Sequence, residues 1–331
     1  MNAPVNLKAP FPYFGGKSRI ADLVWQALGD VPNYVEPFAG SLAVLLARPH
    51  APKTETVNDM DCLLTNFWRA VAMAPDEVAA YADWPVNEVD LEARHYWLVR
   101  QKDAVRDKMG DPDWFDAKVA GWWVWGLSVY IGAGWCDGAG PWRHDGERWS
   151  KSGDAGRGVC RKLPHLGSAG RGVHRALPHL GNAGMGVHRG GAHQLMRDLA
   201  ARLRRVRVAC GDWERVCGPS VTFKHGVTGV FLDPPYSLEN RSEVYAHDCD
   251  DVARRVTVWA LENGGRRDMR IIVCGYQGEH EALTDAGWRV EAWKAHGGYG
   301  SQGDGQGRAN AHRERIWFSP HCLAPTQGRL L

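Results

Sequence analysis

The sequence lacks the features that mark secreted, membrane-spanning and disulfide-stabilised proteins. Its eight cysteines are scattered without a paired framework, and no apolar run approaches the length of a membrane-spanning helix. Residues 1–8 also lack the apolar stretch of a signal peptide. We therefore expect no membrane association and a reducing, cytoplasmic location.

Two common phosphate-binding fingerprints are missing as well. The segment Tyr34 to Ser41 has one glycine, where a dinucleotide-binding turn has three. The segment Pro12 to Ser18 has adjacent glycines, where a phosphate-binding loop separates its glycines by four residues. The first absence argues against a pyrophosphate ligand and fits a cofactor without phosphate.

What the chain does contain is enough apolar material for a sizeable core. It has 331 residues, 44% of them hydrophobic, which suggests one large domain carrying an insertion, or two domains. The formal net charge of +2 is nearly balanced, but arginines cluster between positions 157 and 207. Local basicity of this kind attracts phosphate even where the net charge is small.

Strand and helix patterns alternate along two parts of the chain. Strands are predicted at Tyr34 to Phe38, Thr54 to Val57, Val206 to Cys210, Gly229 to Leu232 and Met269 to Cys274. Helices are predicted at Ser18 to Leu28, Leu42 to Ala47, Leu63 to Ala72, His193 to Arg205 and Val252 to Glu262. This alternation is typical of an α/β fold.

Between residues 84 and 191 the alternation stops, and tryptophan and glycine become frequent. We interpret 84–191 as an inserted domain that divides a catalytic domain into residues 1–83 and 192–331. Inside the insert, the decapeptide Gly158 to Gly167 recurs fourteen residues later as Gly172 to Gly181. Its glycine and proline content favours stacked loops or short hairpins at the surface.

The sharpest chemical signal is an apolar strand that ends in an acidic and aromatic turn, Asp233-Pro234-Pro235-Tyr236. Ligands of open α/β sheets bind at the carboxyl ends of the strands. The Asp233 carboxylate and the Pro234 carbonyl could accept hydrogen bonds from an amino group, and Tyr236 could stack on a nucleic-acid base extruded from its helix. The alternative is an ordinary proline-rich turn.

A second signal is the strand-to-helix turn Glu36-Pro37-Phe38-Ala39-Gly40, where Gly40 permits close approach of a ligand to the backbone. Asp59 follows the next predicted strand, where an acidic residue can accept hydrogen bonds from ribose hydroxyls. Without context, a plain turn and a helix cap would explain these residues equally well.

Together, five segments resemble the ordered motifs of the Dam-like (D12-class) DNA adenine methyltransferases, of the phage or prophage type. They are Phe14-Gly15-Gly16-Lys17, Glu36-Pro37-Phe38-Ala39-Gly40-Ser41, Asn58-Asp59, Gly211-Asp212-Trp213 and Asp233-Pro234-Pro235-Tyr236. The resemblance covers roughly residues 10–72 and 206–320, and Arg313 to Phe318 is similar to the closing strand of the family. Leu42, where many relatives have glycine, and the repeat depart from the family pattern.

The resemblance implies a doubly wound methyltransferase sheet that binds S-adenosylmethionine (AdoMet), with an inserted target-recognition domain. It implies catalytic roles for Asp233, Pro234, Pro235 and Tyr236. It places Asp59 at the cofactor ribose, Asp212 near the cofactor adenine and Lys17 at the target base and its DNA. The expected AdoMet-binding residues are Tyr13, Phe14, Gly15, Gly16, Glu36, Pro37, Phe38, Ala39, Gly40, Asp59, Asp212 and Trp213.

The insert contains the candidates for DNA contact. Arginine can bind phosphates or guanine edges, and the expected DNA-binding residues besides Lys17 are Arg157, Arg161, Arg171, Arg175 and Arg189. The alternative is that these arginines form a solvated face. Trp135 and Trp142 are candidates for base stacking, whereas Val119 to Ile131 is expected to be a buried helix. No metal is expected, because Cys136, His144, Cys160 and His165 do not have the spacing of zinc ligands.

The function that these expectations favour is methylation of adenine N6 in double-stranded DNA, by base flipping and direct in-line attack on the methyl group of AdoMet. We expect a monomer or weak dimer. Two alternatives stay open. One keeps the fold but acts on cytosine N4 or on adenine in RNA, and the other is a catalytically inactive DNA-binding relative.

Overall fold

The computed structural model describes residues 7–11, 17–111, 113–130, 135–136, 142–144, 149–151, 190–236, 243–293 and 313–324. Four predicted cofactor residues and five predicted DNA-binding residues lie outside this part of the chain. They are Tyr13, Phe14, Gly15 and Gly16, and Arg157, Arg161, Arg171, Arg175 and Arg189. The fourteen-residue repeat lies outside it too.

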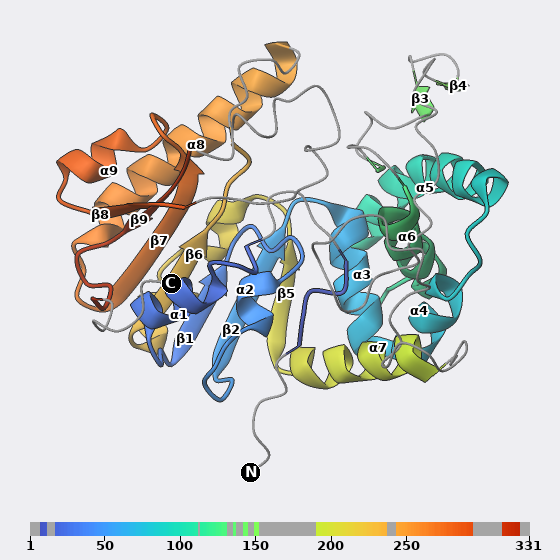
Figure 1. Ribbon diagram of the computed structural model, residues 1–331, viewed down its shortest axis with the longest axis horizontal. Helices are drawn as coiled ribbons and strands as arrows, with labels where there is room; N and C mark the ends of the chain where they lie inside the picture. Colours follow the sequence, from blue (N-terminus) through green and yellow to red (C-terminus); the bar gives the residue numbers. More distant parts are fainter. Residues whose placement is uncertain are drawn as a thin grey trace.

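Seven of the described strands form one mostly parallel sheet (Figure 1). In spatial order they are β5 (Val206–Cys210), β2 (Thr54–Asp59), β1 (Asn33–Glu36), β6 (Thr228–Leu232), β7 (Met269–Tyr276), β9 (Glu314–Phe318) and β8 (Arg289–Ala292). Only the β7–β9 and β8–β9 pairings are antiparallel. The mixed α/β class predicted from the alternating pattern is confirmed, and the sheet is consistent with a methyltransferase fold.

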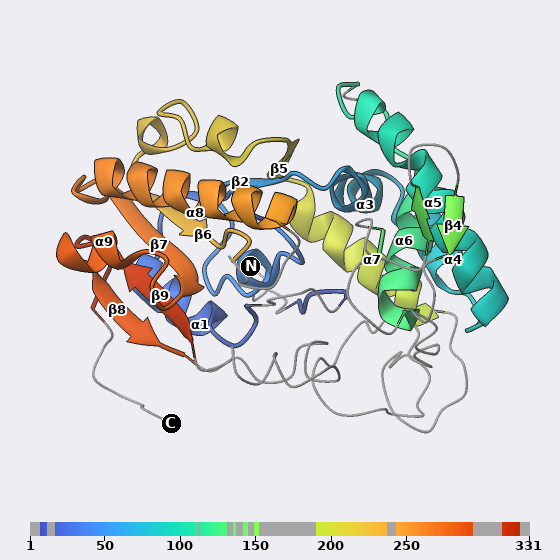
Figure 2. The same ribbon diagram turned by 90° about the horizontal axis from the view of Figure 1, so that it is seen from above.

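Both faces of the sheet are buried, which explains why its central strands are apolar almost throughout. Tyr34, Phe231 and Ile272 share one hydrophobic cluster with helix α1 (Ala21–Leu28). Their neighbours in sequence share the opposite cluster with helix α8 (Glu243–Gly264). Figure 2 shows these two helices on opposite sides of the sheet. The sheet is therefore doubly wound.

The predicted strands coincide closely with the observed ones. The predicted helices correspond to α1, α2 (Ala43–Leu46), α3 (Cys62–Met73), α7 (Gly190–Leu203) and α8, but α8 begins at Glu243 and not at Val252 as predicted. Helices α4 (Pro75–Ala82) and α5 (Glu88–Lys108) were not predicted. Several short elements were not predicted either, among them helix α9 (Glu281–Asp285), strand β8, and the 3-10 turns η1 (Trp213–Val216) and η2 (Phe223–His225).

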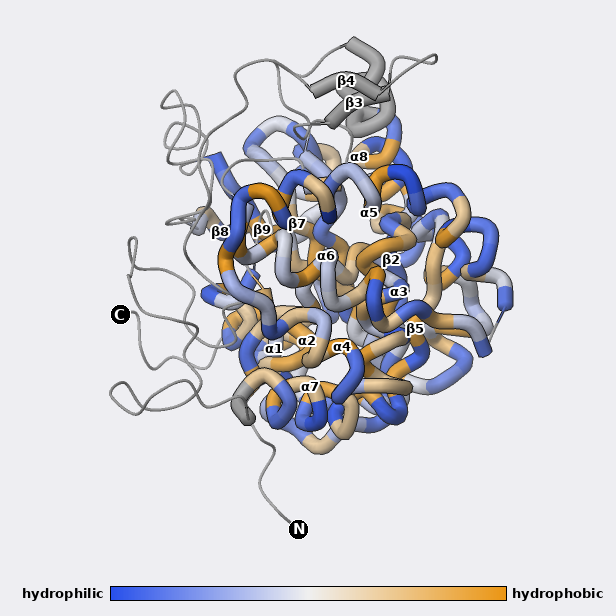
Figure 3. Tube along the Cα trace, turned by 90° about the vertical axis from the view of Figure 1, so that its right-hand side faces the viewer, coloured by the Kyte–Doolittle hydropathy of each residue, from blue (hydrophilic) through white to orange (hydrophobic). Residues whose placement is uncertain are grey.

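A layer of helices lies beside the β5 edge of the sheet. It comprises α3, α4 (Pro75–Ala82), α5 (Glu88–Lys108), α6 (Ala117–Val129) and α7, which pack on one another. Figure 3 shows hydrophilic and hydrophobic stretches alternating along these helices, as expected where one side of a helix is buried. Side-chain caps begin three of the helices, since Asp61, Asn87 and Asp116 accept hydrogen bonds from backbone amides of α3, α5 and α6.

The buried helix predicted around Val119 to Ile131 is confirmed as α6, in which Trp123 and Trp125 are fully buried. The prediction that Trp135 stacks on nucleic-acid bases is wrong. This side chain is 7% exposed, and its Nε1 donates to the Trp123 carbonyl at 3.0 Å. Its ring lies 4.8 Å from that of His95. Glycine-rich flanks suggested exposure, but tertiary packing buries the indole.

Two short strands, β3 (Trp142–His144) and β4 (Trp149–Lys151), form a separate antiparallel pair. Within the described residues, no helix is long and apolar enough to cross a membrane.

Candidate active site

The predicted catalytic and cofactor segments meet where the strand order reverses. The chain runs from β1 outward through β2 to β5, then returns to β6 beside β1 and continues to β7. The carboxyl ends of β1 and β6 are therefore adjacent, and Asn33, Tyr34 and Val35 pair in parallel with residues 228–230. Such a reversal leaves a crevice in which α/β proteins bind ligands. The Gly40 turn and Asp233 both belong to this edge.

Asp233 carries two hydrogen-bonding partners on the same oxygen. Lys17 Nζ lies 2.9 Å from Asp233 Oδ1, and the Tyr236 hydroxyl donates to that oxygen at 3.0 Å. Burial alone would lower the pKa of Lys17, but the charges of Asp233 and Glu314 raise it above its usual value. Lys17 is therefore a cation. Among the described residues, no hydrogen bond to Asp233 Oδ2 is found, and the carboxylate is partly exposed.

Aromatic rings surround this ion pair. The Tyr236 ring meets the Tyr276 ring edge to face at 4.7 Å. Lys17 Nζ lies 5.0 Å from the centre of the Tyr236 ring and 5.6 Å from that of Trp293. A cation held against rings and paired with a carboxylate is stabilised by both, so the side chains of this cluster are held in place.

Three residues near this ion pair, Tyr276, Trp293 and Glu314, were not singled out from the sequence. Tyr276 ends β7, and Glu314 begins β9 directly opposite it. Glu314 was recognised only as part of a closing strand. An acidic residue two positions before the run Ile316 to Phe318, on the same face as two of its apolar residues, was the available signal.

On the cofactor side, the Gly40 turn is tied to Asp59. The Gly40 amide donates to Asp59 Oδ2 at 3.0 Å, and the Asp61 amide donates to Asp59 Oδ1 at 3.0 Å. Burial raises the pKa of Asp59 to about 6, although these backbone hydrogen bonds lower it in part. Gly40 has a positive φ of 47°, and its carbonyl accepts a hydrogen bond from Trp68. Glycine is favoured at such a conformation.

Asn58, near the end of β2, joins the turns that follow the two neighbouring strands, β1 and β5. Its Nδ2 donates to the Pro37 carbonyl at 3.1 Å and to the Gly211 carbonyl at 2.9 Å. Beyond these turns the Phe38 ring stacks on Trp213 at 5.9 Å. Asp212 caps η1 through the Glu214 amide. The buried amide of Asn58 therefore sets the spacing of the predicted cofactor loops.

Asp212 also forms an ion pair with Arg255 of α8, at 3.1 Å. No local pattern pointed to this pairing, because the two residues are far apart in the chain. A ligand hydrogen-bonded to Asp212 would have to share this carboxylate with Arg255.

Leu42 departs from the family pattern in conformation as well as identity. It has a left-handed backbone with φ of 56° and a fully buried side chain. This conformation costs a leucine roughly 1–2 kcal/mol, and burial of the side chain offsets that cost. The turn thus keeps a path that glycine favours while leucine fills the core.

Comparison with known protein families indicates what the protein does. Residues 13–110 match the model of the D12 class N6 adenine-specific DNA methyltransferases. The matched segment is less than a third of the chain, and it is similar to this family. The protein is therefore an enzyme, a DNA adenine methyltransferase. The predicted resemblance to the D12 class is confirmed, and the phage or prophage type stays a prediction. No curated protein matches the chain.

The matched segment of this methyltransferase includes Lys17, Glu36, the Gly40 turn and Asp59. It ends before Asp233 and Tyr236, whose roles are inferred from geometry. The described residues contain no group of histidine, cysteine and acidic side chains that could hold a metal ion.

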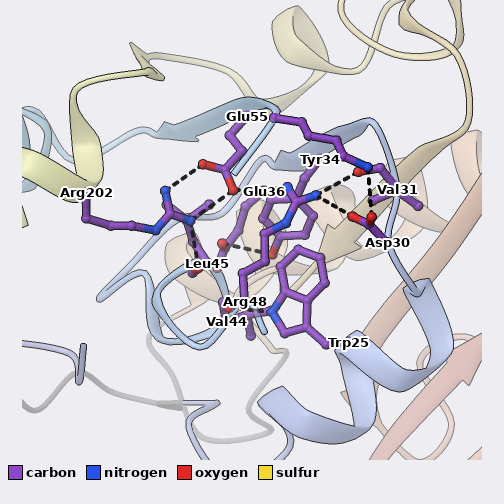
Figure 4. Close-up of polar contacts among 11 residues, drawn as sticks. Trp25, Asp30, Val31, Tyr34, Glu36, Val44, Leu45, Arg48, Glu55 and Arg202 are labelled. Carbon is purple, nitrogen blue, oxygen red and sulfur yellow. Dashed lines mark hydrogen bonds and ion pairs between the residues drawn. The ribbon is translucent and has the colours of Figure 1, made fainter. Parts of the chain in front are cut away.

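Behind the site, the methyltransferase contains a buried ionic network (Figure 4). Arg48 follows α2, and its Nη1 donates to Glu55 Oε1 at 3.1 Å. Arg202 of α7 donates to both oxygens of Glu55, at 2.6 and 2.9 Å. The Glu55 and Arg48 side chains are fully buried. The network joins α2 and α7 to β2, the strand that ends in Asp59.

Glu36 is a buried carboxyl at the end of β1. Its Oε2 accepts a hydrogen bond from the Tyr34 hydroxyl at 3.0 Å. Burial raises the pKa of Glu36 to about 8, with a further contribution from the charge of Asp233. At neutral pH this side chain is therefore largely protonated in the protein alone, and a positively charged ligand would favour its ionised form.

We predict that Glu36→Gln changes how stability depends on pH. The folded pKa of about 8 exceeds the ordinary value of 4.5, so the folded protein keeps a proton that the unfolded chain releases between these values. This contribution is complete below pH 4.5 and is lost as pH rises to 8. The wild type should lose on the order of 4 kcal/mol more than the variant between pH 5 and pH 8.

Urea unfolding at both pH values measures this difference. Glu77→Gln, on the exposed surface of α4, is the matched control and should follow the wild type. If the free energy of unfolding changes equally with pH in the wild type and in Glu36→Gln, the buried, proton-binding role of Glu36 is refuted.

Proposed function

We propose that this methyltransferase transfers a methyl group from AdoMet to the N6 amine of an adenine flipped out of double-stranded DNA. The observation that carries the proposal is the position of Asp233. It is held by Lys17 and Tyr236 at the carboxyl end of β6, beside the turn that follows β1. An acceptor and an aromatic ring are thereby placed next to a turn suited to a cofactor.

Asp233 and Pro234 suit an amine as the methyl acceptor. The lone pair of the adenine amine is delocalised into the ring, so it is a weak nucleophile. Acceptors for both of its N–H groups would favour the tetrahedral nitrogen that forms during transfer. Lys17 and Tyr236 occupy Oδ1 of Asp233, which leaves Oδ2 for one N–H group. We assign the Pro234 carbonyl to the other.

The residues around the Gly40 turn fit AdoMet. They supply acceptors, in Asp59 and Glu36, and a stacked aromatic pair, in Phe38 and Trp213. Acceptors suit ribose hydroxyls and a positively charged sulfur, and they do not suit phosphate. When bound, AdoMet supplies a methyl group on a sulfonium, which is electrophilic without help from a metal. The side chains of the site then orient the amine.

A flipped base requires a surface that replaces the stacking it loses in the duplex. Tyr236 offers its ring at the active site, held by Tyr276 and by its hydrogen bond to Asp233. We assign this ring to the target adenine. Base flipping costs a few kcal/mol, which such stacking offsets in part.

The test is to incubate the purified protein with AdoMet and mixed-sequence double-stranded DNA, then map modified bases by mass spectrometry. N6-methyladenine is the expected product. Formation of N4-methylcytosine, or methylation of RNA alone, would show that the methyl acceptor is not adenine N6 in DNA. AdoMet binding without any methyl transfer would instead support an inactive DNA-binding relative.

We propose further that residues 84–191 recognise the DNA target, through arginines that lie outside the described residues. Neutralising Arg171 and Arg175 together should weaken DNA binding and reduce its salt dependence, because a phosphate without an arginine partner retains about one counterion in the complex. Binding isotherms between roughly 50 and 200 mM salt measure the slope. AdoMet affinity serves as the control. If the dependence of DNA affinity on salt concentration does not change, these arginines belong to a solvated face and do not bind DNA.

A further inference from the structure

Glu314 projects toward the ion pair of the active site. It stands directly opposite Tyr276 in the antiparallel pairing of β9 with β7, and residues opposite one another project to the same face of a sheet. The Tyr276 ring on that face contacts the ring of Tyr236. Ile316 and Phe318, two and four residues later, join the hydrophobic cluster of the same face.

The Glu314 side chain is closed off from solvent and only partly satisfied. The residue is 6% exposed, and its Oε2 has no hydrogen-bond partner among the described residues. A buried carboxylate oxygen without a partner is costly, so it indicates a group that responds to a nearby charge. The charge at hand is Lys17, which is 4% exposed and interacts electrostatically with Glu314.

The positive charge of Lys17 weakens the negative charge that Asp233 offers to a substrate, and Glu314 can compensate for this. Lys17 lies 2.9 Å from Asp233 and opposes most of its negative charge. The amine nitrogen becomes positive as it gains the methyl group, so the reaction favours a net negative charge beside it. A second carboxylate near Lys17 restores that negative charge.

We propose that Glu314 is a positioning residue that acts as a second counter-ion of Lys17 and so leaves the charge of Asp233 available to the adenine amine. This inference rests on the proposed function. In the step itself, the nitrogen lone pair forms the N–C bond and the C–S bonding pair returns to sulfur. The surplus N–H proton then passes to Asp233 and on to water.

The pH at which Glu314 ionises makes the idea testable. Burial raises the pKa of Glu314 to about 7, while Lys17 lowers it and Asp233 raises it. Burial raises the pKa of Tyr236, Cys274 and Tyr276, so these groups stay in one form at neutral pH. Glu36 also interacts with the charge of Asp233, but its pKa of about 8 lies above that of Glu314, and the wild type and the Glu314 variants share it. Arg313 lies over the Tyr276 ring. Ionisation of Glu314 should therefore increase the rate as pH rises through 7.

The experiment compares wild type, Glu314→Gln, Glu314→Asp and the exposed-surface control Glu262→Gln, using single-turnover methylation of DNA at pH 6 and pH 8. At pH 8, Glu314→Gln should be about tenfold slower than wild type. At pH 6 the two should converge, since wild-type Glu314 is then mostly protonated. Affinities for DNA and AdoMet should stay within about twofold, and Glu314→Asp should recover part of the pH dependence.

A merely structural role would slow Glu314→Gln equally at both pH values, and that result would overturn the proposal. If the methylation rate of Glu314→Gln depends on pH as that of the wild type does, the proposal is overturned too. Carbon-13 NMR of labelled glutamate gives a readout without turnover. The resonance that titrates near pH 7 should vanish in Glu314→Gln and should titrate at higher pH in Lys17→Met. If wild type methylates no adenine, the proposed function fails, whereas an unchanged titration in Lys17→Met refutes the pairing itself.

Discussion

Asp233→Ala is expected to reduce the rate of methyl transfer by at least about a hundredfold while leaving DNA binding largely in place. The change removes an acceptor that is needed most when the amine nitrogen becomes tetrahedral, so the loss should fall on kcat more than on KM. It also leaves Lys17 buried without its partner at 2.9 Å. Single-turnover rates with saturating AdoMet and DNA measure the effect.

A companion variant separates chemistry from folding. Asp233→Asn keeps the size of the side chain and can still accept a hydrogen bond from Tyr236, but it carries no charge. It should fold as the wild type does and remain strongly impaired. Asp251→Ala removes a carboxylate from the surface of α8 and should transfer methyl groups normally. Near-normal turnover by folded Asp233→Ala would exclude the catalytic assignment.

The largest expected effect on stability lies at Glu55. Glu55→Ala should lower the free energy of unfolding by about 3–5 kcal/mol. Arg48 and Arg202 would both lose the Glu55 carboxylate, and the fully buried Arg48 would keep only the more distant Asp30 carboxylate, at 3.5 Å, among the described residues. Hydrogen bonds to the Val31 and Leu45 carbonyls would remain, but these groups are neutral. Urea unfolding at neutral pH measures the loss.

The matched control uses an exposed ion pair from the same region. Lys53 lies 2.9 Å from Asp30, and both side chains are largely exposed. Lys53→Ala should cost less than about 1 kcal/mol, because water solvates the remaining carboxylate. Similar losses in the two variants would mean that the buried network contributes no more than a surface pair.

The Glu55 network also bears on the site. It fixes β2 against α2 and α7, and β2 ends in Asn58 and Asp59, whose side chains hold the turns after β1 and β5. A variant that retains enough stability to fold should therefore still show weaker AdoMet binding than wild type. The buried charges thus connect the stability of the sheet to the geometry of its ligand edge.

The sequence by itself predicted most strands of the sheet and most of the residues proposed to act at its ligand edge. Apolar runs define most of β6 and β7, because strands covered on both faces are largely apolar, whereas β1 has only Tyr34 and Val35 between two buried polar residues. Asp233 and the Gly40 turn could be found for a related reason, since polar residues directly after such strands lie at the sheet edge where ligands bind. These signals are local, so they can be recognised in the sequence without knowledge of the fold.

Only the tertiary structure decided which distant side chains share an environment. It placed Lys17 on Asp233, Arg255 on Asp212 and Glu314 opposite Tyr276. It also buried Trp135, whose glycine-rich neighbours had suggested an exposed ring. Charge pairing and burial depend on contacts between segments far apart in the chain, and no local pattern encodes those contacts.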